Sequence, residues 1–318
     1  MRNPATLAAA LALLAGPALA DYPQRPVTMI VPWAAGGGTD AVGRMLAQEL
    51  QSALGQPVNV VNREGAGGIV GHTAMIDADP DGYTIGLATA EITTYAAIGS
   101  SSITAEQMTP IALINFDAAA FNIAADSPWQ SVEEALEDIG ANPGQYLASG
   151  MPVGAAYHLA FAGFMQTHGI DPLALTMVPS QGAAPGFQEL AAGGVHVVPS
   201  SLPEAQPMRD AGRVRTLAVL SAERLASFPD VPTVEEATGT AVVGGTWRGI
   251  VGPAGLPDDI VAVLEAAVQT AHESAAFQEF MASRGFGTTF LPAEEFATFM
   301  ADATASNAEV IAALGLQQ

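Results

Sequence analysis

Short apolar runs alternate with stretches of helical periodicity along most of this chain of 318 residues. Val27–Val31 is the first such run, and apolar residues then recur at helical spacing from Val42 to Leu50. This alternation is typical of a parallel sheet covered by helices on both faces. The sequence therefore predicts an α/β fold. The first strands are expected at Val27–Val31, Val58–Val61 and Tyr83–Ala88, with a helix at Ile69–Ala78 before the third.

The same alternation restarts further along the chain, which implies a second sheet. Extended apolar segments near Phe121–Asp126 and near Val242–Val251 lie between the two alternating regions. We therefore expect the chain to cross between the two domains there. One domain is expected from residues 21–122 and 245–318, and another from residues 123–244. Strands of the second sheet are expected near Tyr146–Ala148, Leu175–Val178, Val195–Val198 and Val214–Leu220, and helices near Val132–Ile139, Ala156–Gln166, Pro185–Ala191 and Glu204–Asp210.

Residues 1–20 have the pattern of a cleaved secretory signal. Arg2 gives a positive start, Leu7–Ala15 is apolar but too short to span a bilayer, and Ala18-Leu19-Ala20 is a cleavage site before Asp21. No later segment reaches the ~18 uninterrupted apolar residues of a membrane span. We therefore expect a soluble mature protein beginning at Asp21, located in the periplasm of a cell with two membranes.

Acidic residues outnumber basic ones by 32 to 10, which gives a formal net charge of −22, and every basic residue is Arg. Nucleic acid is therefore not an expected partner, because neutralising phosphates requires a basic surface. The chain has no Cys. Disulfides, a thiolate nucleophile and a Cys-ligated metal are therefore excluded.

The sequence indicates neither a metal nor a cofactor. The five histidines include no pair at i, i+4 and no H-E-x-x-H motif. There is no G-x-G-x-x-G after the first strand, and no Lys to complete a Walker A motif. The histidines are His72, His158, His168, His196 and His272.

The segment with most information about function is Val31–Asp40, which joins the first strand to a helix through three glycines. Glycines let backbone N–H groups turn toward a ligand, and a helix N-terminus adds partial positive charge, so this loop can hold a carboxylate or phosphate. Ligands of open α/β sheets bind at the carboxyl ends of strands, where this loop lies. A tight turn without a ligand is the alternative. The candidates are Trp33, Ala34, Gly36, Gly37, Gly38, Thr39 and Asp40.

Polar residues after later strands are further candidates. Thr89 and Glu91 follow the third strand, and Glu91 can face a ligand's amino group or favour the N-terminus of the next helix. The Ser and Gln residues can donate to ligand oxygens, although such residues also cap helices. Loops drawn from two domains indicate a cleft. The remaining candidates are Ser149, Gly150, Gly154, Ala155, His158, Ser180, Gln181, Ser200 and Ser201.

Several segments, in one order, resemble the periplasmic substrate-binding proteins of tripartite tricarboxylate transporters, also called the Bug family. The likeness covers nearly the whole mature chain. The segments are Tyr22-Pro23-Gln24-Arg25-Pro26-Val27, Gly36-Gly37-Gly38-Thr39-Asp40, Asn62-Arg63-Glu64-Gly65-Ala66-Gly67-Gly68, Pro80-Asp81-Gly82-Tyr83-Thr84, His158-Leu159, Trp247-Arg248-Gly249 and Pro253-Ala254-Gly255.

The resemblance implies a two-domain periplasmic binding protein of the Venus-flytrap, type II-like kind, with a ligand cleft between the domains. It implies that the loops Trp33–Asp40 and Ser149–His158 hold a small carboxylate through backbone and small polar groups. The ligand would then pass to a membrane permease with no chemistry done. This chain departs from the usual family pattern at Ala155, Ser180-Gln181 and His196, so the resemblance does not indicate which carboxylate binds.

The predicted function is capture of a small di- or tricarboxylate by a monomeric solute-binding protein that is not an enzyme. One alternative is an exported hydrolase that uses a Ser near His158, although no G-x-S-x-G motif occurs. A second alternative is a sensory module that presents the ligand to a membrane receptor.

Overall fold

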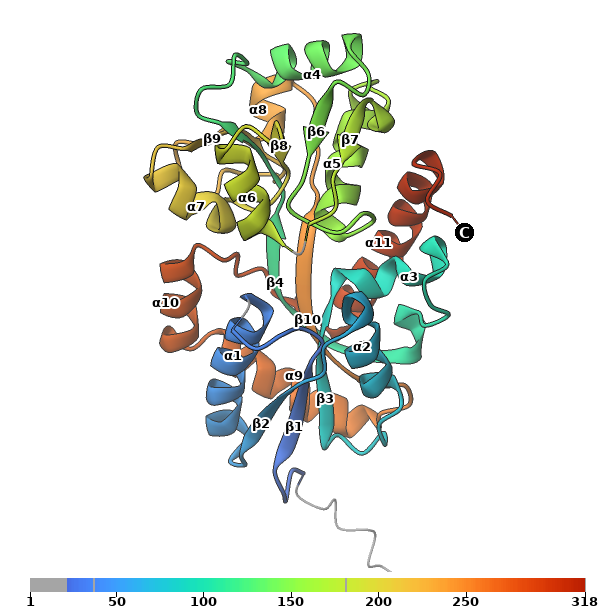
Figure 1. Ribbon diagram of the computed structural model, residues 1–318. Helices are drawn as coiled ribbons and strands as arrows, with labels where there is room; N and C mark the ends of the chain where they lie inside the picture. The colour runs from blue at the N-terminus through green and yellow to red at the C-terminus, as the bar shows by residue number, and fades with distance from the viewer. Residues whose placement is uncertain (1–21, 37, 181, 318) are drawn as a thin grey trace, which may run out of the picture.

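A computed structural model describes residues 22–36, 38–180 and 182–317, which form two lobes, each built on its own sheet (Figure 1). The first sheet has the strand order β11-β4-β10-β3-β1-β2. Its strands are β1 Val27–Val31, β2 Val58–Asn62, β3 Thr84–Thr89, β4 Met108–Ala118, β10 Gly245–Pro253 and β11 Leu291–Pro292.

The second sheet has the order β7-β6-β8-β5-β9. The predicted α/β class is therefore confirmed, with strands close to most of the expected positions. The strands of this sheet are β5 Ala120–Ala124, β6 Tyr146–Ala148, β7 Leu175–Met177, β8 Val197–Val198 and β9 Val214–Val219.

Helices cover both sheets. Those of the first lobe are α1 Gly38–Leu54, α2 Ile69–Ile76, α3 Tyr95–Ile98, α9 Asp258–His272, α10 Ala275–Arg284 and α11 Ala293–Ala313. Those of the second lobe are α4 Val132–Ala141, α5 Ala156–Thr167, α6 Ala183–Ala191, α7 Leu202–Asp210 and α8 Val234–Thr238. Short 3₁₀ turns lie at η1 Ala66–Gly68, η2 Ala90–Thr93, η3 Ala105–Gln107 and η4 Pro172–Ala174.

The first sheet is buried on both faces. Leu46 of α1, Val268 of α9 and Phe277 of α10 belong to one core cluster, whereas Met75 of α2 and Phe296 of α11 belong to another. Val27, Met29 and Val31 of β1 belong to the first cluster and Ile30 to the second, because side chains alternate across a strand. A strand buried on both faces is expected to be a continuous apolar run, which explains the pattern in the sequence.

The sheets are mixed, so the predicted parallel arrangement is wrong for part of each. β10 runs antiparallel to both β3 and β4, and β5 runs antiparallel to β8 and β9. The sequence analysis predicts that the chain crosses between the domains near 242–251, and it predicts no strand at 108–118. Both segments are long apolar strands that continue straight toward the other lobe, and Figure 1 shows β4 and β10 together between the lobes.

The two crossings lie side by side. The chain leaves the first sheet at Ala119 and returns to it at Gly244, and the Ala119 N–H donates to the Gly244 carbonyl over 2.8 Å. Away from these crossings, α11 also reaches the second lobe, where Ile311 packs with Leu159 of α5. The lobes are therefore joined by a pair of strands and one long helix.

Phe296 of α11 packs against β10 and buries one face of that strand. A Cβ added to Gly249 would lie 2.2 Å from the Phe296 ring, and that ring meets Trp247 edge-on at 5.4 Å between centroids. We expect Phe296→Ala to lower the free energy of unfolding by about 3–5 kcal/mol, because it leaves a cavity beneath the strand. Denaturant titration measures this change.

The control is Val263→Ala in α9, where the side chain is 40% exposed. We expect a change within about 0.5 kcal/mol for this exposed position. An equal loss in both variants would contradict the role of Phe296 in covering β10.

Candidate functional site

A buried arginine lies where β3, β10 and β4 end toward the second lobe. Arg248 of β10 pairs in register with Thr89 of β3 and Asn115 of β4, and its side chain is 10% exposed. Its Nη1 donates to Asp117 Oδ2 over 2.6 Å and to Asn115 Oδ1, and its Nε donates to Thr39 Oγ1 over 3.0 Å. Three strands and the first turn of α1 therefore converge on one guanidinium group.

The partners of Arg248 are themselves held in place. Asp117 Oδ1 accepts from the Gly287 N–H over 2.9 Å and from Asn115 Nδ2 over 3.0 Å. Burial lowers the pKa of Arg248, but Asp117, Tyr157 and Glu204 together more than offset this effect and leave the pKa raised. The guanidinium is therefore a permanent positive charge in a fixed position.

One end of this guanidinium is open. Within the described part of the chain, Nη2 of Arg248 makes no hydrogen bond. A Cβ added to Gly38 would lie 3.6 Å from Nη2, and Gly38 itself is exposed. Gly38 begins α1, whose first N–H groups lack partners within the helix and carry partial positive charge. An anion here can meet a guanidinium donor and a helix N-terminus together.

Side chains of the second lobe interact electrostatically with the same charge. Burial raises the pKa of Tyr157 in α5 well above its usual value, Glu204 of α7 raises it further, and Arg248 acts in the opposite direction. Glu204 Oε2 accepts hydrogen bonds from the hydroxyls of Ser200 and Ser201, over 3.2 Å in the second case. The predicted Ser200 and Ser201 are thus held by Glu204, whose negative charge acts to raise the pKa of Arg248.

Trp33, Thr89 and Glu91 form a hydrogen-bonded chain beside Arg248. Trp33 Nε1 donates to Thr89 Oγ1 over 3.2 Å, and that hydroxyl donates to Glu91 Oε2 over 2.6 Å. The Thr89 N–H donates to Nε2 of His72, whose burial lowers its pKa to about 3. Burial raises the pKa of Glu91, whereas Arg248 acts to lower it. The structure therefore brings these three predicted residues together.

Asp40 has a local role. Its carboxylate accepts from the Gly36 N–H over 2.8 Å, from Arg44 Nε over 2.9 Å and from Asn62 Nδ2 over 2.8 Å. Burial opposes ionisation, but these hydrogen bonds leave the pKa of Asp40 lowered. The Gly36 donor is therefore used by the chain's own carboxylate. Of the remaining predicted residues in this loop, Ala34 is exposed and Gly37 lies outside the described residues.

The loops of the second lobe use most of their polar groups internally. Ser149 donates to the Val178 carbonyl, and Ser180 donates to the Gly182 carbonyl, each over 3.0 Å. Gly150 has φ of +105° and packs against Val198, so a side chain there would be strained and would clash. Ala155 precedes α5 as its N-cap residue, and Gln181 lies outside the described residues.

His158 is held by the loop that precedes it. Its Nδ1 accepts from the Gly154 N–H over 2.8 Å, and burial lowers the pKa of His158 to about 4. Among the described residues no serine hydroxyl hydrogen-bonds to this ring, so the Ser–His pair of the hydrolase alternative is not formed here. His158 is a neutral residue that fixes the turn before α5.

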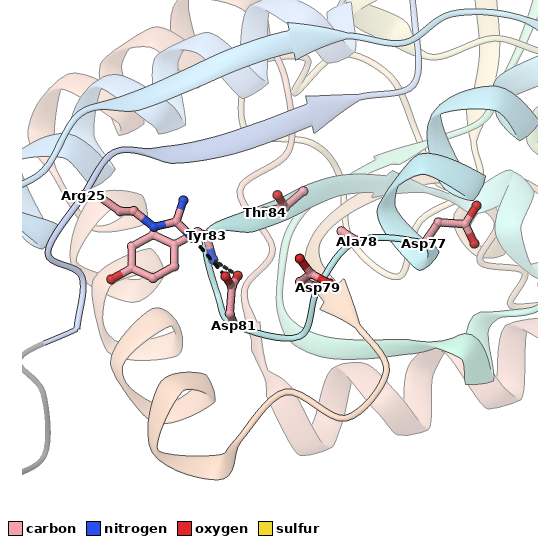
Figure 2. Close-up of a pocket in the computed structure, with 7 residues that line it drawn as sticks. All are labelled: Arg25, Asp77, Ala78, Asp79, Asp81, Tyr83 and Thr84. Carbon is pink, nitrogen blue, oxygen red and sulfur yellow. Dashed lines mark hydrogen bonds and ion pairs between the residues drawn. The ribbon is translucent and has the colours of Figure 1, made fainter. Parts of the chain in front are cut away.

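A surface pocket of about 330 Å³ lies elsewhere on the first lobe (Figure 2). Arg25 pairs there with Asp81 over 2.9 Å and lies over the Tyr83 ring. Thr84 begins β3, whereas Thr89 ends it, so this pocket lies at the opposite end of the strand from the predicted loops. It is lined by Arg25, Asp77, Ala78, Asp79, Asp81, Tyr83 and Thr84.

The described residues contain neither a metal-binding cluster nor a membrane-spanning helix. No group of three or more His, Asp or Glu residues there is arranged to hold a metal ion. Within the same residues, no helix has the length and apolar character needed to cross a membrane.

Sequence reasoning missed Arg248, Asp117, Tyr157 and Glu204 as site residues. The available signal was Arg248 itself, the one charged residue in the apolar segment 241–256. A charge in a buried strand requires a partner, which makes it a candidate for function.

The buried His158 makes stability depend on pH. Its folded pKa of about 4 lies below the unfolded value of ~6.5, so the unfolded chain binds more protons between these values. The stabilisation is complete above the unfolded pKa and is lost as pH falls toward the folded pKa. We expect His158→Gln to make the loss of unfolding free energy between pH 6 and 4.5 shallower by about 1 kcal/mol per pH unit. Equal slopes, measured by denaturant titration at each pH, would contradict this expectation.

Comparison with known proteins identifies the family. The family model described as "Tripartite tricarboxylate transporter family receptor" matches residues 42–316. Protein BugT of Bordetella pertussis is 31% identical over 300 residues, which cover 92% of this chain and 90% of BugT.

Two solved structures from Rhodopseudomonas palustris have the same fold. MatC with bound malate has a TM-score of 0.74 at 27% identity, covering 91% of this chain and 100% of MatC. A second protein, solved with adipate, has a TM-score of 0.80 at 26% identity, covering 93% of this chain and 99% of that one. The chain therefore belongs to the Bug family, the periplasmic receptors of tripartite tricarboxylate transporters, and has their two-domain α/β fold.

Proposed function

We propose that this protein captures a small organic carboxylate between its two lobes and delivers it to the membrane permease of a tripartite tricarboxylate transporter. The observation that carries this proposal is the open Nη2 of Arg248 beside the exposed Gly38. A carboxylate there accepts from the guanidinium and from the first N–H groups of α1. Membership of the family supports delivery to a permease, and relatives solved with malate and adipate support the carboxylate class.

Local donors can hold an anion in this acidic chain, whose formal net charge is −22. Two unit charges ~10 Å apart in water interact by only about 0.4 kcal/mol before salt screening. A hydrogen bond to a charged group contributes roughly 1.5–3 kcal/mol. A few donors at Arg248 and α1 therefore outweigh a distant acidic surface.

In this proposal the domains are residues 21–122 with 245–318 and residues 123–244, and they close over the ligand. The loops Trp33–Asp40 and Ser149–His158 flank the bound carboxylate, and Ser201 approaches it from the second domain. Cleavage after residue 20 releases a monomeric, periplasmic protein that performs no chemistry.

Replacement of Arg248 tests the site. We expect Arg248→Lys to weaken carboxylate binding by roughly tenfold or more, because a lysine keeps the charge that Asp117 requires but loses the planar fork that reaches both Asp117 and the ligand. Calorimetric titration with the carboxylate released from the purified protein and identified by mass spectrometry gives the dissociation constants.

The matched control is Arg224→Lys, an exposed arginine that pairs with Glu236 in the second lobe. We expect unchanged affinity in this variant. If Arg248→Lys kept its fold by circular dichroism and bound the carboxylate with unchanged affinity, the guanidinium would not be part of the binding site.

A further inference from the structure

His72 of α2 is a fully buried histidine with both ring nitrogens engaged. Its Nε2 lies 3.2 Å from the Thr89 backbone nitrogen, and its Nδ1 lies 3.0 Å from the Tyr95 hydroxyl oxygen. A backbone N–H can only donate, so Nε2 is the acceptor and the neutral ring carries its proton on Nδ1. The Tyr95 hydroxyl accepts from Nδ1–H and donates to the Gly67 carbonyl over 2.8 Å. One tautomer therefore satisfies every group in this chain of hydrogen bonds.

Two glycines let α2 and the His72 ring lie this close to their partners. A Cβ added to Gly71 would lie 2.5 Å from Pro32 Cα, so α2 packs directly against the loop that follows β1. Gly68 precedes α2 with φ of +96°, and a Cβ there would lie 2.7 Å from the Tyr95 hydroxyl and 3.3 Å from His72 Nδ1. A side chain at either glycine would force the helix or the ring away from its place.

The Thr89 N–H requires this acceptor. The register of β3 with β1 extends over Thr84–Gly86, so Thr89 lies beyond it, at the buried end of the strand. A buried backbone N–H without a partner costs free energy comparable to a lost hydrogen bond. Burial lowers the pKa of His72 to about 3, so the ring is neutral and Nε2 remains an acceptor at neutral pH. His72 therefore supplies the hydrogen bond that a neighbouring strand supplies elsewhere in the sheet.

Thr89 in turn orients two of the predicted site residues. Its hydroxyl accepts from Trp33 Nε1 over 3.2 Å and donates to Glu91 Oε2 over 2.6 Å. Its backbone is the register partner of Arg248 in the neighbouring strand β10. A displacement of Thr89 would therefore redirect the side chains of Trp33 and Glu91 at the carboxyl end of β3.

We propose that His72 is a positioning residue of the carboxylate site. It does not touch the ligand, because its side chain is fully buried. By accepting from the Thr89 N–H, it fixes the hydroxyl that orients the Trp33 indole. A site that is already held in its binding arrangement loses less conformational entropy when the ligand binds. This inference rests on the proposed function and adds a residue to its site.

Two substitutions separate the roles of the two ring nitrogens. The amide oxygen of His72→Gln reaches the position of Nε2, whereas the shorter side chain of His72→Asn reaches only that of Nδ1. We expect His72→Asn to weaken carboxylate binding by about tenfold or more, because the buried Thr89 N–H loses its partner and the end of β3 moves. We expect His72→Gln to stay within about threefold of the parent, because it keeps the acceptor.

Calorimetric titration measures these affinities near neutral pH. The probes are a panel of small mono-, di- and tricarboxylates that includes malate and adipate, the compounds bound in the two solved relatives. Each variant is titrated with the panel member that the parent protein binds most tightly.

The Trp33 indole gives a readout that a loss of stability alone would not move. Its N–H donates to Thr89 Oγ1, so its NMR resonance, assigned with Trp33→Phe, reports where Thr89 lies. We expect this resonance to shift in ligand-free His72→Asn and to return to the parent position in His72→Gln. The indole of Trp129 donates to Asp138 in the second lobe over 2.8 Å, and its resonance should stay unchanged in both variants.

The matched control is His168→Asn in the second lobe. This half-buried histidine is also bonded through both nitrogens, to the Phe164 carbonyl and the Thr238 hydroxyl. We expect it to keep the parent affinity and the parent Trp33 resonance. The ring nitrogens of His72 in the parent protein test the proposal even where His72→Asn does not fold. Nitrogen NMR showing the proton on Nε2 at neutral pH would overturn it, because that nitrogen could not accept from Thr89.

Unchanged affinity or an unchanged Trp33 resonance in His72→Asn would overturn the proposal and leave carboxylate capture standing. Equal losses of affinity in His72→Asn and His72→Gln would also overturn it, because His72 would then act through packing and not through its Nε2 acceptor. Failure of the parent protein to bind any carboxylate of the panel would instead remove the proposed function itself.

Discussion

The ion pair between Arg248 and Asp117 is the interaction on which the rest of the site depends. Taking two charges out of water offsets most of their mutual attraction, so such a pair contributes little net stability. The pair instead fixes the position of the Arg248 guanidinium. Arg248 lies on β10 and Asp117 on β4, the two strands that lead toward the second lobe, and Gly287 and Asn115 complete the hydrogen bonds of the carboxylate. Breaking the pair would leave a buried charge between the lobes.

Local patterns predicted much of the fold. The run Val27–Val31 forms β1 as expected, and Tyr146–Ala148 forms β6 with the expected bounds. Strand direction was not predictable in this way, because a long apolar segment such as β10 has the same pattern whether its neighbours run parallel or antiparallel. Its partners β3 and β4 lie far earlier in the chain, and only tertiary pairing sets its direction.

The candidate site was predictable only where it follows strand ends. Trp33, Thr89 and Glu91 meet because the carboxyl ends of β1 and β3 lie at one edge of the sheet. Arg248 was not identified, since its role depends on register with Asn115, which precedes it by 133 residues. Neither hydrophobic periodicity nor a short motif indicates that Arg248 pairs with a residue so far away in the sequence.

The glycine loop also shows why a motif alone does not establish an anion site. The sequence offered backbone N–H groups and a helix N-terminus, and both can hold a carboxylate. In the folded chain the Gly36 N–H is bound by the carboxylate of Asp40, four residues later. One N–H donor of the loop thus stabilises the loop's own conformation and does not bind a ligand. For an external anion at Gly38, the open Nη2 of Arg248 therefore supplies a donor in addition to the first N–H groups of α1.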